Sequence, residues 1–447
     1  MSMSFIIACE SGKRKIAELL LENNEADVTY TDEKGRTALH YAAHRGYLDL
    51  VKILIEKGAK LDYEDHDGET PFYFACLQKQ KQTALYLLEK GARTDINDLQ
   101  GNSLLHLAAH TAQIEILEKL LEQGLNIDSE NNEAETPLLI ASSCRNKEIV
   151  QKLLENGANV NTTNKQGNTP LLFAVKSKNA PMVELLLENG ANINHVNHAG
   201  ESALLIACYE TNRMLTKLLV EKGADVFASS KNGLSPVWYA CANNQKEIVS
   251  LFLENGVDVN YSKPTSGNED SMYSYLDWVE TANNLASDNS FNLSNNYSCG
   301  GESMLHVASK NGYLSMVKLL AENGANINIQ DESGNTALHY AAANGKKDIV
   351  KYLLENRADA SIVNAKEQKA IDYSNIKGFN EITELLLKFS PENTAKFEQK
   401  ESTISSEIPK NDMASKKHAL LDLKELLDAG ILSQEEFEAE KSKILKG

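Results

Sequence analysis

The sequence has few of the residues that mark several common classes of protein. Only 6 of its 447 residues are cysteine, which is no disulfide framework. No apolar run reaches the roughly 18 residues that a membrane-spanning helix needs, and we expect no secretory signal, because the chain shows no basic segment followed by a long apolar stretch. Lys and Arg number 45 against 63 Asp and Glu, and the net charge of −18 argues against nucleic acid as a partner. Aromatic residues, at 6%, indicate many small packing units rather than one large core.

One phrase recurs along the chain at intervals of 33 residues. The segment from Gly35 to Ala43 (GRTALHYAA) returns from Gly68 to Cys76 (GETPFYFAC), and a Leu-Leu-Glu-x-Gly-Ala phrase follows each copy. The Ser or Thr of the phrase stands at positions 37, 70, 103, 136, 169, 202, 235, 303 and 336, and Lys369 takes its place in the last copy. Such a fixed period predicts a repeat protein, in which each unit stacks on its neighbours.

Each part of the phrase has a physical reason. The Ser or Thr can cap a first helix, and four prolines fall at its first position, where a missing N–H costs nothing. Apolar residues at helical spacing then predict a second helix, which ends near a glycine such as Gly58. The Asp-x-x-Gly or Asn-x-x-Gly stretch before each phrase reads as a turn. The four prolines are Pro71, Pro137, Pro170 and Pro236.

These residues resemble the ankyrin repeat, with its Thr-Pro-Leu-His-x-Ala signature. The resemblance covers residues of about 3 to 389 in eleven units, the first and last of which depart from the pattern as water-facing caps do. It implies an all-α solenoid of helix-turn-helix repeats with hairpin-like turns. We expect this array to occupy residues 1–389.

Two stretches interrupt or follow the period. Between the eighth and ninth repeats the chain has 35 extra residues, which fall mostly within residues 261–300, a stretch rich in Ser and Asn. We interpret residues 261–300 as a loop insertion or a degenerate repeat. Residues 390–416 lose periodicity and are polar, which is typical of a flexible linker.

The end of the chain, residues 417–447, reads as two helices. Its Leu-Lys-Glu-Leu-Leu-Asp-x-Gly-Ile-Leu-Ser-x-Glu-Glu-Phe pattern resembles the short C-terminal domain found at the tails of many bacterial proteins, which implies a bacterial origin and a role in oligomerisation. A unit this short buries too little surface to be stable alone, so we expect it to dock on a second copy, the array or another protein. The residues expected to mediate this are Leu423, Leu426, Leu427, Phe437 and Ile444.

Signs of catalysis or cofactor binding are weak. His40 and His44, and likewise His106 and His110, have the i, i+4 spacing of metal ligands. However, the resemblance gives the histidines at 40, 106, 306 and 339 a structural role, and no Cys or carboxylate completes a site. No phosphate-binding, dinucleotide-binding or serine-hydrolase motif is present. We therefore predict no catalytic residues, no metal and no cofactor, and a chain that is not an enzyme.

By the resemblance, a partner would bind in a concave groove formed by the turns and the first helices. The contact positions are the two residues between Asp or Asn and Gly, the one after Gly, and the two after Ala-Ala. Trp238, which replaces the signature His, is the strongest candidate for an anchor; three leucines at the same position (Leu139, Leu172, Leu205) are expected in the core. The predicted partner-binding residues are Glu33, Lys34, Arg36, His44, Arg45, His66, Asp67, Glu69, Lys165, Lys176, Glu201, Tyr209, Glu210, Lys231, Leu234 and Trp238.

These observations predict a non-catalytic scaffold that binds a protein partner, without nucleic acid or membrane insertion, and with a possible homo-oligomer formed through the tail. Cysteines without a disulfide pattern favour the cytoplasm. Two alternatives stay open: a bacterial effector secreted into a host cell to act on host proteins, and an enzyme whose activity resides in residues 261–300.

Overall fold

The computed structural model describes residues 2–23, 26–230, 233–263 and 300–389, together with isolated positions between 420 and 442. In these residues the chain forms eleven pairs of α-helices and three isolated β-bridges, so the fold is all-α, as the repeats predict. The contacts divide the chain into two units, Met1–Asp258 and Val259–Gly447.

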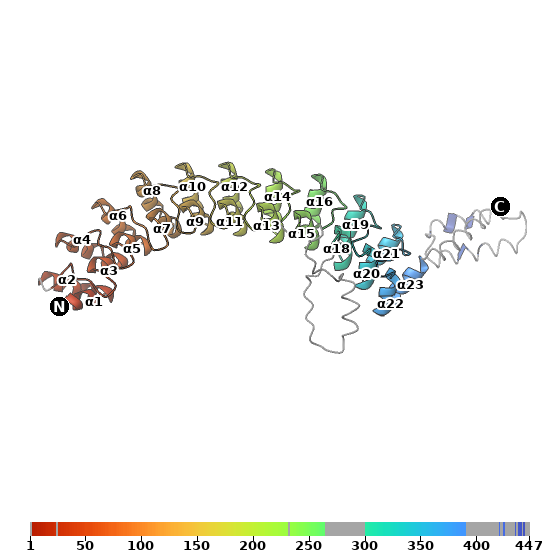
Figure 1. Ribbon diagram of the computed structural model, residues 1–447, viewed down its shortest axis with the longest axis horizontal. Helices are drawn as coiled ribbons and strands as arrows, with labels where there is room; N and C mark the ends of the chain where they lie inside the picture. Colours follow the sequence, from red (N-terminus) through yellow and green to blue (C-terminus); the bar gives the residue numbers. More distant parts are fainter. Residues whose placement is uncertain are drawn as a thin grey trace, which may run out of the picture. The chain divides into compact units, whose positions relative to one another are not determined.

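The first unit contains eight helix pairs, one for each of the first eight repeats (Figure 1). The first helices of the pairs are α1 (Ser2–Glu10), α3 (Ala38–Arg45), α5 (Pro71–Leu77), α7 (Leu104–Thr111), α9 (Pro137–Ser143), α11 (Pro170–Lys176), α13 (Ala203–Tyr209) and α15 (Pro236–Ala242). The second helices are α2 (Arg14–Glu22), α4 (Leu48–Glu56), α6 (Lys81–Glu89), α8 (Ile114–Glu122), α10 (Lys147–Glu155), α12 (Ala180–Glu188), α14 (Arg213–Glu221) and α16 (Lys246–Glu254).

The second unit contains three helix pairs in its described part. They are α18 (Met304–Asn311) with α19 (Leu314–Glu322), α20 (Ala337–Ala343) with α21 (Lys347–Glu355), and α22 (Ala370–Ile376) with α23 (Asn380–Lys388). Within each unit, a first helix packs against its own second helix and against the first helices of the neighbouring repeats. This nearest-neighbour packing is the arrangement of a solenoid.

The core of each unit is built from the small and aliphatic residues of the repeated phrase. Leu139, Leu172 and Leu205, which stand where other repeats have His, are 1%, 1% and 4% exposed, as expected of core residues. Four cysteines that stand where the second repeat has Ala43 are also buried: Cys9, Cys76, Cys208 and Cys241. Burial raises the pKa of the Cys9 thiol to about 12. Thiols in such surroundings act as small apolar side chains and not as nucleophiles.

The first helices begin as the sequence predicts. Thr70 has an extended backbone, and its hydroxyl oxygen accepts a hydrogen bond from the Tyr73 N–H at 3.3 Å, which satisfies one unpaired donor of the helix start. Pro71 follows at the first helical position. Most second helices end before glycines with a positive φ, such as Gly58 at 88°, a conformation that costs other residues more.

The turn before the ninth repeat closes like the turns of regular repeats, although 35 residues are inserted between Lys263 and Gly301. Residues 264–299 lie outside the described residues. Lys263 N–H donates to the Glu302 carbonyl at 3.0 Å, and Gly301 N–H donates to the Lys263 carbonyl at 3.0 Å. In the fourth repeat, Asp98 makes the same pair of bonds with Asn102 and Gly101. The inserted residues therefore join the two arms of one interrepeat turn.

The loop that precedes this turn also has its regular partner. The Asn260 side-chain oxygen accepts the Asn326 N–H at 2.8 Å, just as the Asn161 side-chain oxygen accepts the Asn192 N–H at 2.8 Å three repeats earlier. The spacing between the bonded residues is 66 in the first case and 31 in the second. The difference is the 35 residues that were added.

Candidate protein-binding surface

All but one of the residues expected to contact a partner lie in two places in a repeat: at the turn before the first helix, and at the carboxyl end of that helix. The exception is Trp238, which lies in the first turn of α15. None of them is fully buried among the described residues. Lys231 lies outside the described residues. The exposed ones are Glu33, Lys34, Arg45, His66, Asp67, Lys165, Lys176 and Tyr209, and the half-buried ones are Arg36, His44, Glu69, Glu201, Glu210, Leu234 and Trp238.

The turns are held by a side chain that accepts backbone hydrogen bonds. In the second repeat, Asp32 Oδ1 accepts the N–H groups of Lys34 and Arg36, both at 2.9 Å, and the Asp32 N–H donates to the Arg36 carbonyl at 3.0 Å. Neighbouring turns are linked as well, because the His66 N–H donates to the Lys34 carbonyl at 3.0 Å. Contact residues at the turns therefore project from a fixed backbone.

The signature histidines fix the first helices. The Thr37 N–H donates to His40 Nδ1 at 3.0 Å, and His40 Nε2 donates to the Glu69 carbonyl of the next repeat at 3.2 Å. The first bond requires an unprotonated Nδ1, so the imidazole is neutral with its proton on Nε2. Burial lowers the pKa of His40 to about 4 in agreement with this assignment. His106 and His339 make the same two bonds. His306 accepts the Ser303 N–H in the same way, but its Nε2 donates to the Ile329 carbonyl at 3.0 Å, at a different position of the next repeat. This is the structural role that the resemblance implies.

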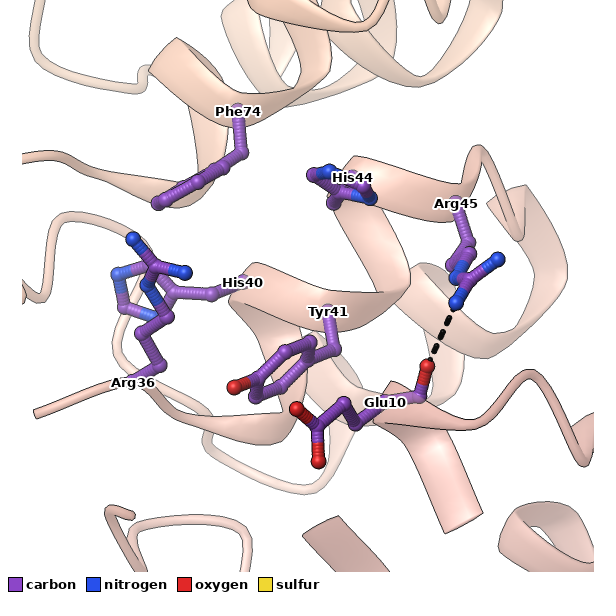
Figure 2. A pocket seen from close by; sticks show the side chains of 7 residues that line it. All are labelled: Glu10, Arg36, His40, Tyr41, His44, Arg45 and Phe74. Carbon is purple, nitrogen blue, oxygen red and sulfur yellow. Dashed lines mark hydrogen bonds between the residues drawn. The ribbon is translucent and has the colours of Figure 1, made fainter. Parts of the chain in front are cut away.

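A cavity of about 190 Å³ lies at the amino-terminal end of the first unit, where α1, α3 and α5 meet. Figure 2 shows the side chains around it, drawn from the first three repeats. Three predicted contact residues, Arg36, His44 and Arg45, line the cavity together. The complete lining is Glu10, Arg36, His40, Tyr41, His44, Arg45 and Phe74.

Arg36 forms one wall of the cavity and is held on three sides. Its Nε donates to Asp65 Oδ2 at 2.9 Å, its Nη2 lies 3.6 Å from Glu69 Oε2, and its guanidinium carbon lies 4.6 Å from the centre of the Phe74 ring. Burial, and next the charge of Asp65, raise the pKa of Glu69 to about 7. The charge of Arg36 is therefore largely met within the protein, and its guanidinium lies over an aromatic face.

Arg45 and His44 form the opposite side. Arg45 Nη2 donates to the backbone carbonyl of Glu10 at 2.8 Å, which the dashed line in Figure 2 marks. The His44 ring lies 6.0 Å from the Phe74 ring. Burial lowers the pKa of His44, and the positive charges of Arg45 and Arg36 lower it further. The cavity is therefore electropositive at this side.

Besides the signature histidine His40, the structure adds three cavity residues that the sequence rule did not select. Tyr41 and Phe74 occupy the same repeat position, and aromatic residues at that position in further repeats were the available signal. Glu10 occupies the first position after Ala-Cys in the first repeat. Applying the contact rule to this capping repeat would have found it.

An aromatic chain runs along the other end of the same unit. Tyr209 is 65% exposed at the end of α13, its ring lies 5.7 Å from that of Tyr239, and the Tyr239 ring lies 6.0 Å from that of Trp238, both nearly perpendicular. The Trp238 indole N–H is buried without a hydrogen-bond partner in the described part of the chain. The three rings form an aromatic cluster on two neighbouring repeats, in which Tyr209 is exposed and Trp238 and Tyr239 are half-buried.

The charged contact residues in the middle of the unit form ion pairs with residues of neighbouring repeats. Lys176 Nζ lies 3.0 Å from Glu201 Oε2, and Lys165 Nζ lies 3.6 Å from Glu133 Oε1. Glu210 pairs in the same way with Lys178 at 3.0 Å. These pairs are solvent-exposed and contribute about 0–1 kcal/mol each to stability.

Asp65, Asp67 and Glu69 could supply metal ligands, since one carboxylate oxygen of each lies within 4.8 Å of the others. Asp65 is already engaged, because its Oδ1 accepts the Asp67 and Glu69 N–H groups at 3.0 and 2.9 Å and its Oδ2 binds Arg36. The guanidinium of Arg36 therefore already supplies a positive charge to this cluster.

For the tail, the described residues include two of the five expected to mediate oligomerisation. Leu423 is 3% exposed and Phe437 is half-buried. Leu426, Leu427 and Ile444 lie outside the described residues.

Stacked helix pairs with capped first helices and hydrogen-bonded turns define a helical repeat protein of the solenoid class. A family model described as ankyrin repeats (3 copies) matches residues 5–98, 105–197, 171–263, 279–366 and 305–401, which together exceed half of the chain. The chain therefore belongs to the ankyrin-repeat family. A second family model, the short C-terminal domain, matches residues 418–445. No match was found among curated proteins.

The family suggests a protein–protein interaction role, and ankyrin-repeat proteins are typically non-catalytic. Among the described residues, the helices are too short or too polar to cross a membrane.

Proposed function

We propose that this chain is a non-catalytic scaffold that binds a partner protein along its turns and the carboxyl ends of its first helices. The observation that carries this proposal is the recurrence of partly exposed, chemically varied side chains at these positions, on a backbone that the Asp32-type turns and the His40-type caps hold in place. Preorganised surfaces of this kind lose little entropy on binding.

The test is affinity purification on the full chain, with variants in two parts of the surface. Arg36→Glu with Arg45→Glu, and separately Trp238→Ala, should reduce recovery of a specific protein, because charged and aromatic anchors carry most binding energy. Arg213→Glu is the matched control, since Arg213 is exposed at the start of the second helix α14, away from the contact positions. Equal recovery with all variants would contradict the assignment of the surface.

We also propose the domain boundaries: an array in residues 1–389, a linker in 390–416 and a two-helix unit in 417–447. The regular hydrogen bonds of Lys263 and Asn260 around the insertion support a loop rather than an additional repeat for residues 261–300. A cytoplasmic location fits the described cysteines, most of which are buried and none of which forms a disulfide, because reduced thiols persist there.

For the tail, we propose self-association or docking through its apolar face. Low exposure of Leu423 supports a covered position. Light scattering on the full chain should show a lower mass for Leu423→Glu with Phe437→Glu than for the unchanged chain. Lys424→Glu is the control, since its side chain is exposed. An unchanged mass in both variants would exclude self-association through this face.

A further inference from the structure

The cavity between the first three repeats has the size of one side chain. Its volume is about 190 Å³, and an engineered cavity of about 150 Å³ accepts benzene. It opens beside residues at the contact positions of the second repeat, Arg45 and His44, so a partner that follows the first helices passes over it. The chemistry of its lining therefore selects the partner residue that enters.

The hydrogen-bond donors of Arg45 are the main polar feature that the protein leaves available there. A guanidinium has five N–H donors, and within the described residues Arg45 uses one nitrogen, for the Glu10 carbonyl at 2.8 Å. That bond anchors the side chain at the cavity rim. Among the described residues, no carboxylate lies within ion-pair distance of Arg45. Arg36, in contrast, already binds Asp65 and Glu69.

The remaining walls suit the carbon chain and the second oxygen of an acidic residue. Phe74 presents a ring that Arg36 covers on one face and that His44 approaches at 6.0 Å. The imidazole of His44 is half-buried between the two arginines, and it can donate a hydrogen bond to an anion. The Glu10 side chain, exposed and on the lining, is the one acidic group that would oppose an anion there.

We propose that this cavity receives an Asp or Glu side chain of the partner protein, with the carboxylate on Arg45 and His44 and the methylene groups against Phe74. The proposal rests on the proposed function, since it names the chemistry of one anchor in the same surface. Charge-assisted hydrogen bonds from a guanidinium to a carboxylate are stronger than neutral ones, and their geometry is specific.

The test begins with a displayed library of random dodecapeptides, panned against the full chain. The enriched peptides should share an acidic residue. One of them, synthesised with a fluorescein label, should bind at least tenfold more weakly when that residue is replaced by Gln, and Arg45→Gln should weaken the unchanged peptide by a similar factor. The two changes together should cost little more than either one, because both remove the same contact.

The neighbouring variant Glu10→Gln should change the affinity for the peptide in the opposite direction. It removes the opposing charge while the backbone carbonyl that holds Arg45 remains, so the same peptide should bind about threefold more tightly. Arg213→Gln, on the second helix α14, should leave binding unchanged.

Other outcomes overturn the proposal. Enriched peptides that share a basic residue, with weaker binding to Glu10→Gln, would show that the cavity receives a cation. Peptides that lose affinity with Trp238→Ala but not with Arg45→Gln would overturn the acidic anchor and leave the proposed function standing. Failure to enrich any peptide, together with unchanged partner recovery by every surface variant, would reject the proposed function itself.

Discussion

Replacing one signature histidine should change stability in a way that depends on pH. In His306→Leu, the Ser303 N–H and the Ile329 carbonyl lose the partners that His306 provides at 3.0 Å each. Leaving these groups unpaired costs about 1–3 kcal/mol each, and the buried leucine returns about 2 kcal/mol. We therefore expect a net loss of about 2 kcal/mol at pH 7, although leucine is native at this position in three other repeats, where the surroundings differ.

The difference in stability between His306→Leu and the unchanged protein changes sign on acidification. Burial lowers the pKa of His306 from 6.5 to about 4. Between these values the unfolded chain binds more protons than the folded one, so the stability of the unchanged protein falls as the pH drops from 6.5 to 4. The gap corresponds to about 3 kcal/mol. Since His306→Leu lacks this loss, its deficit should vanish near pH 5, and it should be more stable than the unchanged protein by about 1 kcal/mol at pH 4.

Urea denaturation followed by circular dichroism at several pH values measures this difference. Glu302 and Asp331 have pKa values raised by burial, which has the opposite effect on acid stability, but both proteins contain them, so they largely cancel in the comparison. The control is Leu305→Ala in the same helix, which should cost about 2–5 kcal/mol at every pH, because it removes apolar volume alone. Hydrogen exchange should place the change in α18 and α20. A deficit of His306→Leu that stays constant from pH 7 to 4 would refute the neutral capping role.

Two further stability predictions follow from the helix caps and the turns. Thr169→Ala should destabilise by about 1 kcal/mol, because it removes the hydroxyl that accepts the Leu172 N–H at 3.3 Å, whereas Thr169→Ser should change little; equal urea midpoints for both would contradict the cap. Gly334→Ala should cost more stability than Gly58→Ala. Both glycines have a positive φ, which costs alanine about 1 kcal/mol. However, a methyl group on Gly334 would approach the Ala365 nitrogen to 3.1 Å, whereas one on Gly58 would meet nothing within 4 Å. Thermal melting of the two variants measures the difference, and equal shifts would mean that the close approach is unimportant.

Much of the fold follows from the repeated phrase. The starts of the first helices could be predicted from the period, the capping Ser and Thr residues and the prolines, because these signals depend on a few neighbouring residues. The resemblance also implied the role of His40, whose partner in the next repeat comes from the stacking that the period requires. The inserted segment could be counted from the register, yet only the bonds of Lys263 and Asn260 show that it interrupts a single turn.

The surface was harder to predict from the chain. The contact rule selected Arg36 and Arg45 as equivalent basic residues, but their environments differ. Asp65 and Glu69 of the next repeat pair with Arg36. Arg45 instead donates to a backbone carbonyl of the preceding repeat. Sequence by itself determined the stacked helix pairs and the family, because local signals repeated every 33 residues leave one consistent arrangement. Only the tertiary structure decided which charges remain available to a partner, because that depends on side chains from three different repeats that meet at one cavity.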